Sequence, residues 1–288
     1  MRRLVLEFTK MHGAGNDFVV IDNRFYHFDD AQLSEMAARL CHRRLGIGAD
    51  GLLALCLTDE DTEPDLDFRM RYFNADGSLG LMCGNGARVL SRFAHESGIR
   101  KPVLRFDTSA GLYHAMVPED ADLPVRLSMP LFQDYRPDVF VSAEAYSAMG
   151  PIDYVFTGTQ HAVAFVADVW EFDVAFWGPL LRWHPVFAPY GINMNFVGVM
   201  DSGSDTSPAH LRIRTYEKGV EAETLACGTG ALAAAIVART RHLVHSNHVH
   251  LSPKGGDIEV GFTFAEGVFS ALYQAGPTAT VFRGSIYL

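Results

Sequence analysis

The chain has 288 residues, of which 48% are hydrophobic, and its formal net charge is −10. This length suits two domains of ordinary size, each with a full hydrophobic core. The negative charge, with no cluster of lysines or arginines, argues against a nucleic-acid partner. The apolar runs fall well short of the ~20 residues that cross a bilayer, and the charged first residues leave no signal-like core. We therefore expect a cytoplasmic globular protein that binds neither nucleic acid nor membrane.

The elements of the first half begin with a strand, a turn and a second strand. Residues 6–22 alternate, turn at the Gly-Ala-Gly-Asn of 13–16, and resume as an apolar strand. A helix is predicted over 29–46, with Asp29 or Asp30 as its N-cap and Gly46 at its end. Two further strands are predicted at 51–57 and 66–74.

The second half is predicted to contain a similar set of elements. The class is α+β with mainly antiparallel strands. The predicted elements are strands at 162–167, 193–199, 211–216, 248–252 and 257–264, and a helix at 228–240.

An internal repeat relates the two halves. Residues 68–87, "FRMRYFNADGSLGLMCGNGA", align with 211–231, "LRIRTYEKGVEAETLACGTGA". Strand, loop, cysteine, Gly-x-Gly and helix occur twice in the same order, so Cys83 and Cys227 occupy equivalent positions. A duplicated structural unit whose cysteines merely pack is the alternative interpretation.

Both of these cysteines are predicted to lie at the first turn of a helix. A free cysteine has a pKa of roughly 8.5, and the helix dipole and unpaired N–H groups favour its thiolate. The neighbouring glycines let the backbone approach a bound anion such as a carboxylate. If two such sites held one substrate, one thiolate could remove an α-proton while the opposite thiol returned one, inverting the carbon without any cofactor.

The other cysteines and the histidines give no sign of a metal site. The four cysteines, Cys41, Cys56, Cys83 and Cys227, are widely spaced and contain no CxxC, so we expect reduced thiols. The stretch "HLVHSNHVH" contains four histidines without an adjacent acidic or cysteine ligand, and we expect a solvated surface there. "GIGADG" at 46–51 follows a predicted helix and precedes a strand, the reverse of a dinucleotide-binding fingerprint.

Several long stretches resemble the diaminopimelate epimerase family, in order from residue 8 to about residue 260. They are "FTKMHGAGNDFVVID", "GIGADG", "FNADGSLGLMCGNGAR" and "RTYEKGVEAETLACGTGA". The resemblance implies two pseudo-symmetric domains, each a strand-rich antiparallel barrel around a central helix. It places 1–127 plus 277–288 in the first domain, with Cys83, and 128–276 in the second, with Cys227. It also implies a homodimer.

The activity implied by this resemblance is interconversion of LL- and meso-2,6-diaminopimelate, in lysine and cell-wall precursor biosynthesis. No cofactor, PLP included, and no metal are expected. Cys83 and Cys227 would be the base and acid pair, with His161 and Glu217 assisting. The residues implied to bind the substrate are Asn16, Asn74, Gly84, Asn85, Thr159, Asn193, Glu217, Lys218, Gly228 and Thr229.

Outside this pattern some of these residues have simpler interpretations. His161 alone would be a hydrogen-bonded histidine at a strand start, and Asn74 alone would be a turn residue. The chain also departs from the family, which usually has arginine at position 218 and Asn-Pro at 159–160. Lysine cannot reproduce the bidentate fork that arginine offers a carboxylate.

Two alternative functions therefore remain open. A racemase of another amino acid, such as histidine, would keep the fold and the thiols but need no contact to a distal carboxylate. A thiol redox or binding protein would use the same two cysteines to form a reversible disulfide.

Overall fold

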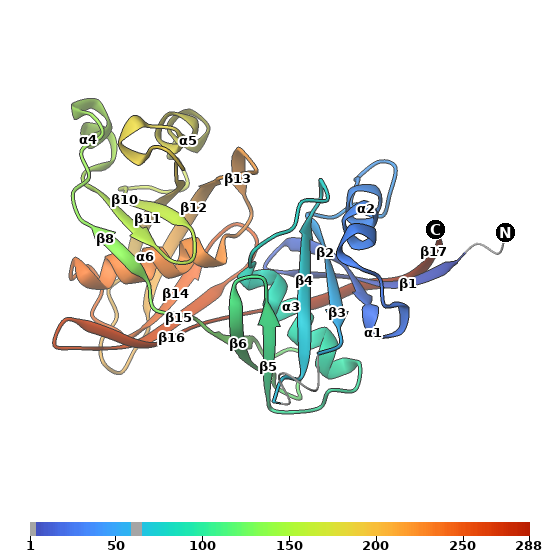
Figure 1. Ribbon diagram of the computed structural model, residues 1–288. Helices are drawn as coiled ribbons and strands as arrows, with labels where there is room; N and C mark the ends of the chain where they lie inside the picture. Colours follow the sequence, from blue (N-terminus) through green and yellow to red (C-terminus); the bar gives the residue numbers. More distant parts are fainter. Residues whose placement is uncertain (1–3, 59–64) are drawn as a thin grey trace. The chain divides into compact units, whose positions relative to one another are not determined.

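The computed structural model describes residues 4–58 and 65–288 (Figure 1). The chain divides into two compact units. Unit 1 comprises Met1–Ser128 with Gly276–Leu288, and unit 2 comprises Met129–Ala275. Among the described helices, none is long and apolar enough to cross a membrane.

In unit 1, antiparallel and parallel strand pairs alternate along the chain. β1 and β2 are antiparallel, β2 and β3 parallel, β3 and β4 antiparallel, β4 and β5 parallel, and β5 and β6 antiparallel. The last strand of the chain, β17, pairs antiparallel with β1. The elements are β1 (Val5–Gly13), β2 (Asn16–Asp22), α1 (Asn23–Tyr26), α2 (Asp30–Leu40), β3 (Gly51–Cys56), β4 (Phe68–Asn74), α3 (Gly84–Glu96), β5 (Val103–Thr108), β6 (Gly111–Met116), β7 (Val125–Ser128) and β17 (Ala279–Tyr287).

Unit 2 repeats the same alternation. β9 and β10 are antiparallel, β10 and β11 parallel, β11 and β12 antiparallel, β12 and β14 parallel, and β14 and β15 antiparallel. The elements are β8 (Gln133–Arg136), α4 (Ala143–Met149), β9 (Ile152–Phe156), β10 (Gln160–Phe165), α5 (Val174–Arg182), the 3₁₀ turn η1 (Pro185–Phe187), β11 (Asn193–Asp201), β12 (Ala209–Glu217), β13 (Ala222–Thr224), α6 (Gly228–Thr240), β14 (His248–Ser252), β15 (Ile258–Ala265) and β16 (Val268–Gly276).

Helices interrupt the two ladder runs at matching places. α2 separates β2 from β3 as α5 separates β10 from β11, and α3 separates β4 from β5 as α6 separates β12 from β14. The predicted duplication is therefore confirmed at the level of topology. The strand-rich α+β class is confirmed as well.

The helix that follows each cysteine is the centre of its unit. α6, orange in Figure 1, packs against β9, β10, β11, β12 and β15, and its residues from Ala231 to Ala238 are all buried. A helix that is apolar on every side requires such an enclosure, and its alanines let the strands approach closely. α3 contacts β1, β2, β3, β4 and β7 in the same manner.

Two details of the predicted helices need correction. The helix that begins after Asp29 has the expected cap, a capping box with Gln32, but it ends at Leu40 and not at Gly46. The carbonyls of Leu40 and of the C-cap residue Cys41 accept hydrogen bonds from the N–H groups of Gly48 and Ala49 as the chain folds back. α5 was not predicted, because it contains Gly178 and Pro179. It packs against β12, where Gly178 lies against Tyr216, and this tertiary contact overrides the poor helix propensity.

Candidate active site

Cys83 is the N-cap of α3, as the sequence predicted. Its backbone is extended, with φ −132° and ψ 115°, and its Sγ accepts a hydrogen bond from the N–H of Gly86 at 3.4 Å. An N–H aimed at sulfur and the positive end of a helix both favour a thiolate. The thiol is partly exposed, so it can meet a substrate.

Two asparagines of unit 1 surround Cys83. The Oδ1 of Asn16 lies 3.5 Å from Sγ and accepts a hydrogen bond from Asn85 Nδ2 at 3.4 Å. Asn16 Nδ2 donates to Asp50 at 2.7 Å, which turns the amide so that its oxygen faces the sulfur. The structure therefore brings together Cys83, Asn16 and Asn85, three of the predicted site residues.

Arg88 lies behind this group and was not predicted. Its side chain is completely buried, and it donates a 2.5 Å hydrogen bond to Asn85 Oδ1. Burial lowers the pKa of Arg88 to about 10, and the nearby Cys83 opposes that shift. The guanidinium is still charged at neutral pH, so it is a fixed cation beneath the helix start. The arginine in "CGNGARVL", a charged residue in an otherwise uncharged helix start, was the sequence signal for this cation.

Cys227 is the N-cap of α6, with φ −121° and ψ 109°, and it is buried. Its Sγ lies 3.6 Å from the hydroxyl oxygen of Thr229. A Cβ on Gly228 would lie 2.6 Å from Gln274 Oε1, and a Cβ on Gly230 would lie 2.4 Å from Asn195 Oδ1. A side chain at either position would therefore displace Gln274 or Asn195, while the approach of this backbone to a bound anion stays a prediction.

His161 lies at the start of β10, fully buried beside the first turn of α6. Its Nε2 is 2.9 Å from Thr229 Oγ1, and its Nδ1 is 3.1 Å from Asn195 Nδ2. Burial, and to a lesser degree the charge of Lys218, lower the pKa of His161 to about 3. The imidazole is therefore neutral at physiological pH. Asn195 was not predicted, although it is the second asparagine of "INMNFV".

Three of the residues implied to bind the substrate, Thr159, Asn193 and Lys218, form a second group in unit 2. The ammonium group of Lys218 donates to Gln160 Oε1 at 2.5 Å, and the backbone N–H of Lys218 donates to Asn193 Oδ1 at 2.8 Å. The hydroxyl of Thr159 is 3.4 Å from the same Gln160 oxygen. Burial and the charge of Arg182 lower the pKa of Lys218. Gln160, which was not predicted, is the residue that joins this group.

Asn74 and Glu217 make local contacts of a different kind. Asn74 Oδ1 accepts from the hydroxyl of Tyr72 at 2.7 Å, and its Nδ2 donates to Ser78 at 2.9 Å. Glu217 accepts from the hydroxyl of Thr224 at 2.8 Å, across the β12–β13 pair. These hydrogen bonds of Asn74 are those of a turn residue, the simpler interpretation of its sequence position.

The two remaining cysteines contrast with this pair. Burial raises the pKa of Cys41 to about 12 and also raises the pKa of Cys56. All four cysteines are free thiols. Cys41 and Cys56 are therefore poor nucleophiles and bases, and reactivity is expected at the helix N-caps.

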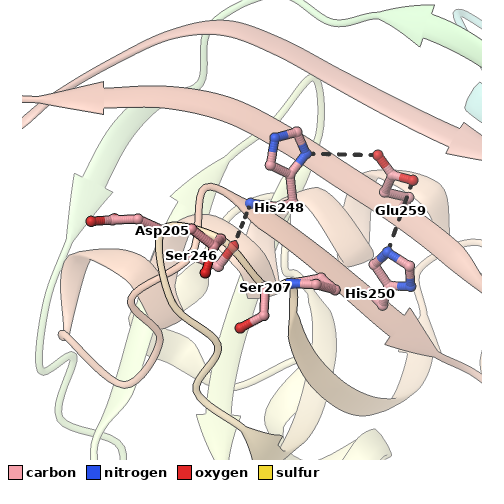
Figure 2. A pocket seen from close by; sticks show the side chains of 8 residues that line it. Asp205, Ser207, Ser246, His248, His250 and Glu259 are labelled. Carbon is pink, nitrogen blue, oxygen red and sulfur yellow. Dashed lines mark hydrogen bonds and ion pairs between the residues drawn. The ribbon is translucent and has the colours of Figure 1, made fainter.

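The histidine-rich stretch forms a separate polar surface. His248 and His250 line a cavity of about 400 Å³ in unit 2 together with Asp205 and Glu259. Figure 2 shows both rings facing the carboxylate of Glu259, at 3.9 Å and 4.0 Å. The tertiary structure thus supplies an acidic neighbour that the local sequence lacked. Across residues 4–58 and 65–288 no cluster of three or more metal-ligating side chains is found.

Each of the two duplicated units has a cysteine as the N-cap of its central helix, an arrangement that fits an isomerase of the epimerase and racemase class. Solved structures share the fold across nearly the whole chain. A PhzF-family phenazine biosynthesis protein from Bacillus anthracis has a TM-score of 0.76 at 15% identity, covering 99% of this chain and 100% of that one. A hydroxyproline epimerase from Agrobacterium vitis has a TM-score of 0.68 at 16% identity, covering 100% and 93%.

Sequence comparison narrows the class to one family. The family model for diaminopimelate epimerase matches residues 8–129 and 154–281. The diaminopimelate epimerase of Chlorobaculum tepidum is 41% identical and that of Aromatoleum aromaticum 40% identical, with 96% and 98% of this chain covered and 100% and 98% of theirs. The chain belongs to the diaminopimelate epimerase family, which confirms the resemblance inferred from its motifs.

Proposed function

We propose that this protein interconverts LL- and meso-2,6-diaminopimelate by removing the α-proton on one face and returning a proton on the other. The observation that carries the proposal is the pair of free cysteines, each the N-cap of a buried helix in one of two duplicated units. Membership of the family supplies the substrate.

In the proposed reaction one sulfur is a thiolate and the other a thiol. The thiolate takes the α-proton and becomes a thiol, leaving a carbanion whose charge spreads onto the adjacent carboxylate. The opposite thiol then gives its proton to the carbon and becomes a thiolate, so the two sulfurs exchange roles with each turnover. The backbone N–H groups of Gly84, Asn85, Gly228 and Thr229 are assigned to hold the carboxylate as it gains enolate character.

We assign supporting roles to the residues around each sulfur. In unit 1 Asn16 and Asn85 bind polar groups of the substrate, and the Arg88 cation stabilises negative charge. His161 and Thr229 do so in unit 2, while Asn193, Lys218 and Thr159 contact the distal end of the substrate. Glu217 assists the thiols, and Asn74 binds polar groups of the substrate. No PLP or metal is part of the proposal.

The domain boundaries, location and assembly are also proposals. Residues 1–127 plus 277–288 form the domain with Cys83, and 128–276 form the domain with Cys227. Free thiols that must stay reduced favour the cytoplasm. A homodimer is supported by β17, where Val281, Phe282 and Tyr287 are 56%, 46% and 62% exposed. Sedimentation analysis tests it, and a monomer at micromolar concentration would contradict it.

A second candidate keeps the fold and thiols and changes the substrate. Lys218 and Gln160 stand where the family usually has arginine and proline, and their side chains are bonded to each other. A lysine occupied in this way is a weaker ligand for a distal carboxylate than an arginine fork. This favours testing an amino acid without that carboxylate, such as histidine.

Purified protein incubated with LL-diaminopimelate in deuterated water, without cofactor, tests the function. The meso product should appear with deuterium at the inverted carbon, because the returned proton comes from an exchangeable thiol. An unlabelled early product would contradict the two-base scheme. Inversion of histidine with none of diaminopimelate would favour the second candidate. Reversible disulfide cycling without inversion of either would favour a redox protein.

A further inference from the structure

The amide of Asn195 has one possible orientation. Its Nδ2 donates to the carbonyl oxygen of Ala162 at 2.9 Å, with the carbonyl oxygen of Asn193 farther away at 3.4 Å, and its Oδ1 accepts from the hydroxyl of Thr215 at 2.9 Å. Exchanging the nitrogen and the oxygen would place two carbonyl oxygens against each other. The NH₂ group must therefore also be the atom that faces Nδ1 of His161, 3.1 Å away.

This orientation determines where His161 carries its proton. A neutral imidazole has one donor nitrogen and one acceptor nitrogen. Since Asn195 presents a donor to Nδ1, Nδ1 must be the acceptor and the proton must lie on Nε2. Nε2 is 2.9 Å from Thr229 Oγ1, so it donates to that oxygen.

The Thr229 hydroxyl connects His161 to Cys227. The Thr229 oxygen accepts from His161, and its own hydrogen is left to donate to another atom. Cys227 Sγ lies 3.6 Å from it. A hydroxyl that donates to sulfur stabilises the thiolate relative to the thiol.

We propose that Asn195, held by Thr215, is a positioning residue that keeps His161 in the Nε2–H tautomer, so that the Thr229 hydroxyl donates to Cys227 and favours its thiolate. In this arrangement Asn195 and Thr215 act through His161. The effect on turnover rests on the proposed function, whereas the tautomer and the ionisation of Cys227 do not.

Burial and neighbouring charge support a histidine that stays neutral. Asn195 and His161 are both completely buried. On the strands beside β10, the residues directly opposite His161 are Val155 and Asn193, neither of which titrates. Lys218 is the charged group that acts on His161, and it disfavours an imidazolium. Gly230 adds a packing reason, because a side chain there would displace Asn195 Oδ1.

The first experiment is nitrogen NMR on protein with labelled histidine. The chain has twelve histidines, so the His161 signals are assigned by their loss in His161→Gln. We expect Nε2 to carry the proton and Nδ1 to be bare at all pH values from 5 to 8. A proton on Nδ1, or titration near pH 6.5, would overturn the proposal. Because no substrate is added, this result is independent of whether diaminopimelate is turned over.

The second experiment measures ionisation of Cys227 by its alkylation with iodoacetamide against pH, read by peptide mass spectrometry. Asn195→Ala should raise the thiol pKa by about one unit, which slows alkylation roughly tenfold at neutral pH. Thr215→Val should shift it in the same direction by less, because the bond to Ala162 persists. Asn195→Asp should move the proton of His161 to Nδ1. An unchanged Cys227 profile in folded Asn195→Ala and Thr215→Val would overturn the proposal.

Turnover provides a third readout that a purely structural role would not give. Asn195→Ala should lower kcat and shift its pH profile to higher pH, with KM changed less than kcat. Asn247→Ala is the matched control, since Asn247 precedes β14 and its contact is a backbone bond to Phe262. It should leave the pH profile in place. If Asn247→Ala shifted the pH dependence of Cys227 alkylation as much as Asn195→Ala does, the shift would come from a general loss of packing. That result would contradict the positioning role.

Discussion

The Nε2 of His161 lies 2.9 Å from the hydroxyl oxygen of Thr229, joining the start of β10 to the first turn of α6. These residues are 68 positions apart in the chain. Through this contact, the Thr229 hydroxyl lies between a neutral imidazole and the sulfur of Cys227. Thr229 is therefore more than a backbone donor at a helix start.

Replacing the hydroxyl of Thr229 tests this contact. Thr229→Val keeps the shape but removes the bridge between His161 and Cys227, and we expect kcat for inversion to fall on the order of 10²-fold. Thr229→Ser keeps the bridge and should retain most of the rate. Initial rates of deuterium incorporation measure both. Equal rates in the two variants would mean that the hydroxyl takes no part.

Removing either sulfur should stop inversion. Cys83→Ala and Cys227→Ala should each lower the rate of inversion by at least ~10³-fold, because each leaves one face of the carbon without a proton carrier. Circular dichroism and the melting temperature check the fold. Cys56→Ala is the control, since that thiol has a raised pKa. Normal turnover by either N-cap variant would contradict the two-base scheme.

The ammonium group of Lys218 should affect substrate binding more than chemistry. Lys218→Met removes the charge beside Gln160, and we expect KM for diaminopimelate to rise about tenfold, or ~1.4 kcal/mol, with kcat less affected. Lys218→Arg should lower KM. Lys254→Met is the matched control, because Lys254 pairs with Glu223 outside this group. A KM unchanged by Lys218→Met would remove Lys218 from the binding site.

Stability should depend on pH through His161. Its pKa is about 3 in the folded protein and near 6.5 when unfolded. Between these values the unfolded chain binds the extra proton, so stability is complete above pH 6.5 and is lost as the pH falls. The slope contributed by this group is up to ~1.4 kcal/mol per pH unit. Urea unfolding from pH 7 to pH 5 should show a smaller loss for His161→Gln than for the wild type.

Gly230 should tolerate no side chain. In Gly230→Ala the new Cβ would lie 2.4 Å from Asn195 Oδ1 and 3.3 Å from Cys227 Sγ, and we expect a loss of roughly 1–3 kcal/mol of stability. Gly198→Ala is the control, because its Cβ would meet Val169 at an ordinary 3.6 Å. Urea denaturation compares the two. Equal stability would show that the α6 start can shift away from Asn195.

Much of the secondary structure was predictable because it depends on local pattern. The helix that follows Cys227 begins at Gly228 and ends at Thr240, the predicted range, since an alanine-rich run favours a helix locally. α5 was not predictable, because its glycine and proline oppose a helix and because Tyr216, against which it packs, lies in β12, far along the chain. The predicted end of α2 was wrong for a similar reason, since N–H groups of residues beyond the helix donate to the carbonyls at its C-terminus.

The sequence alone determined the duplication, the two cysteine N-caps and the family, because repeats, caps and motifs lie within short stretches of chain. Only the tertiary structure decided what surrounds each sulfur. Asn195 and Thr215 carry no local signal of function, and hydrogen bonds between residues far apart in the chain bring them to the site. Those contacts set the tautomer of a buried imidazole and the placement of a buried cation, which no local pattern can specify.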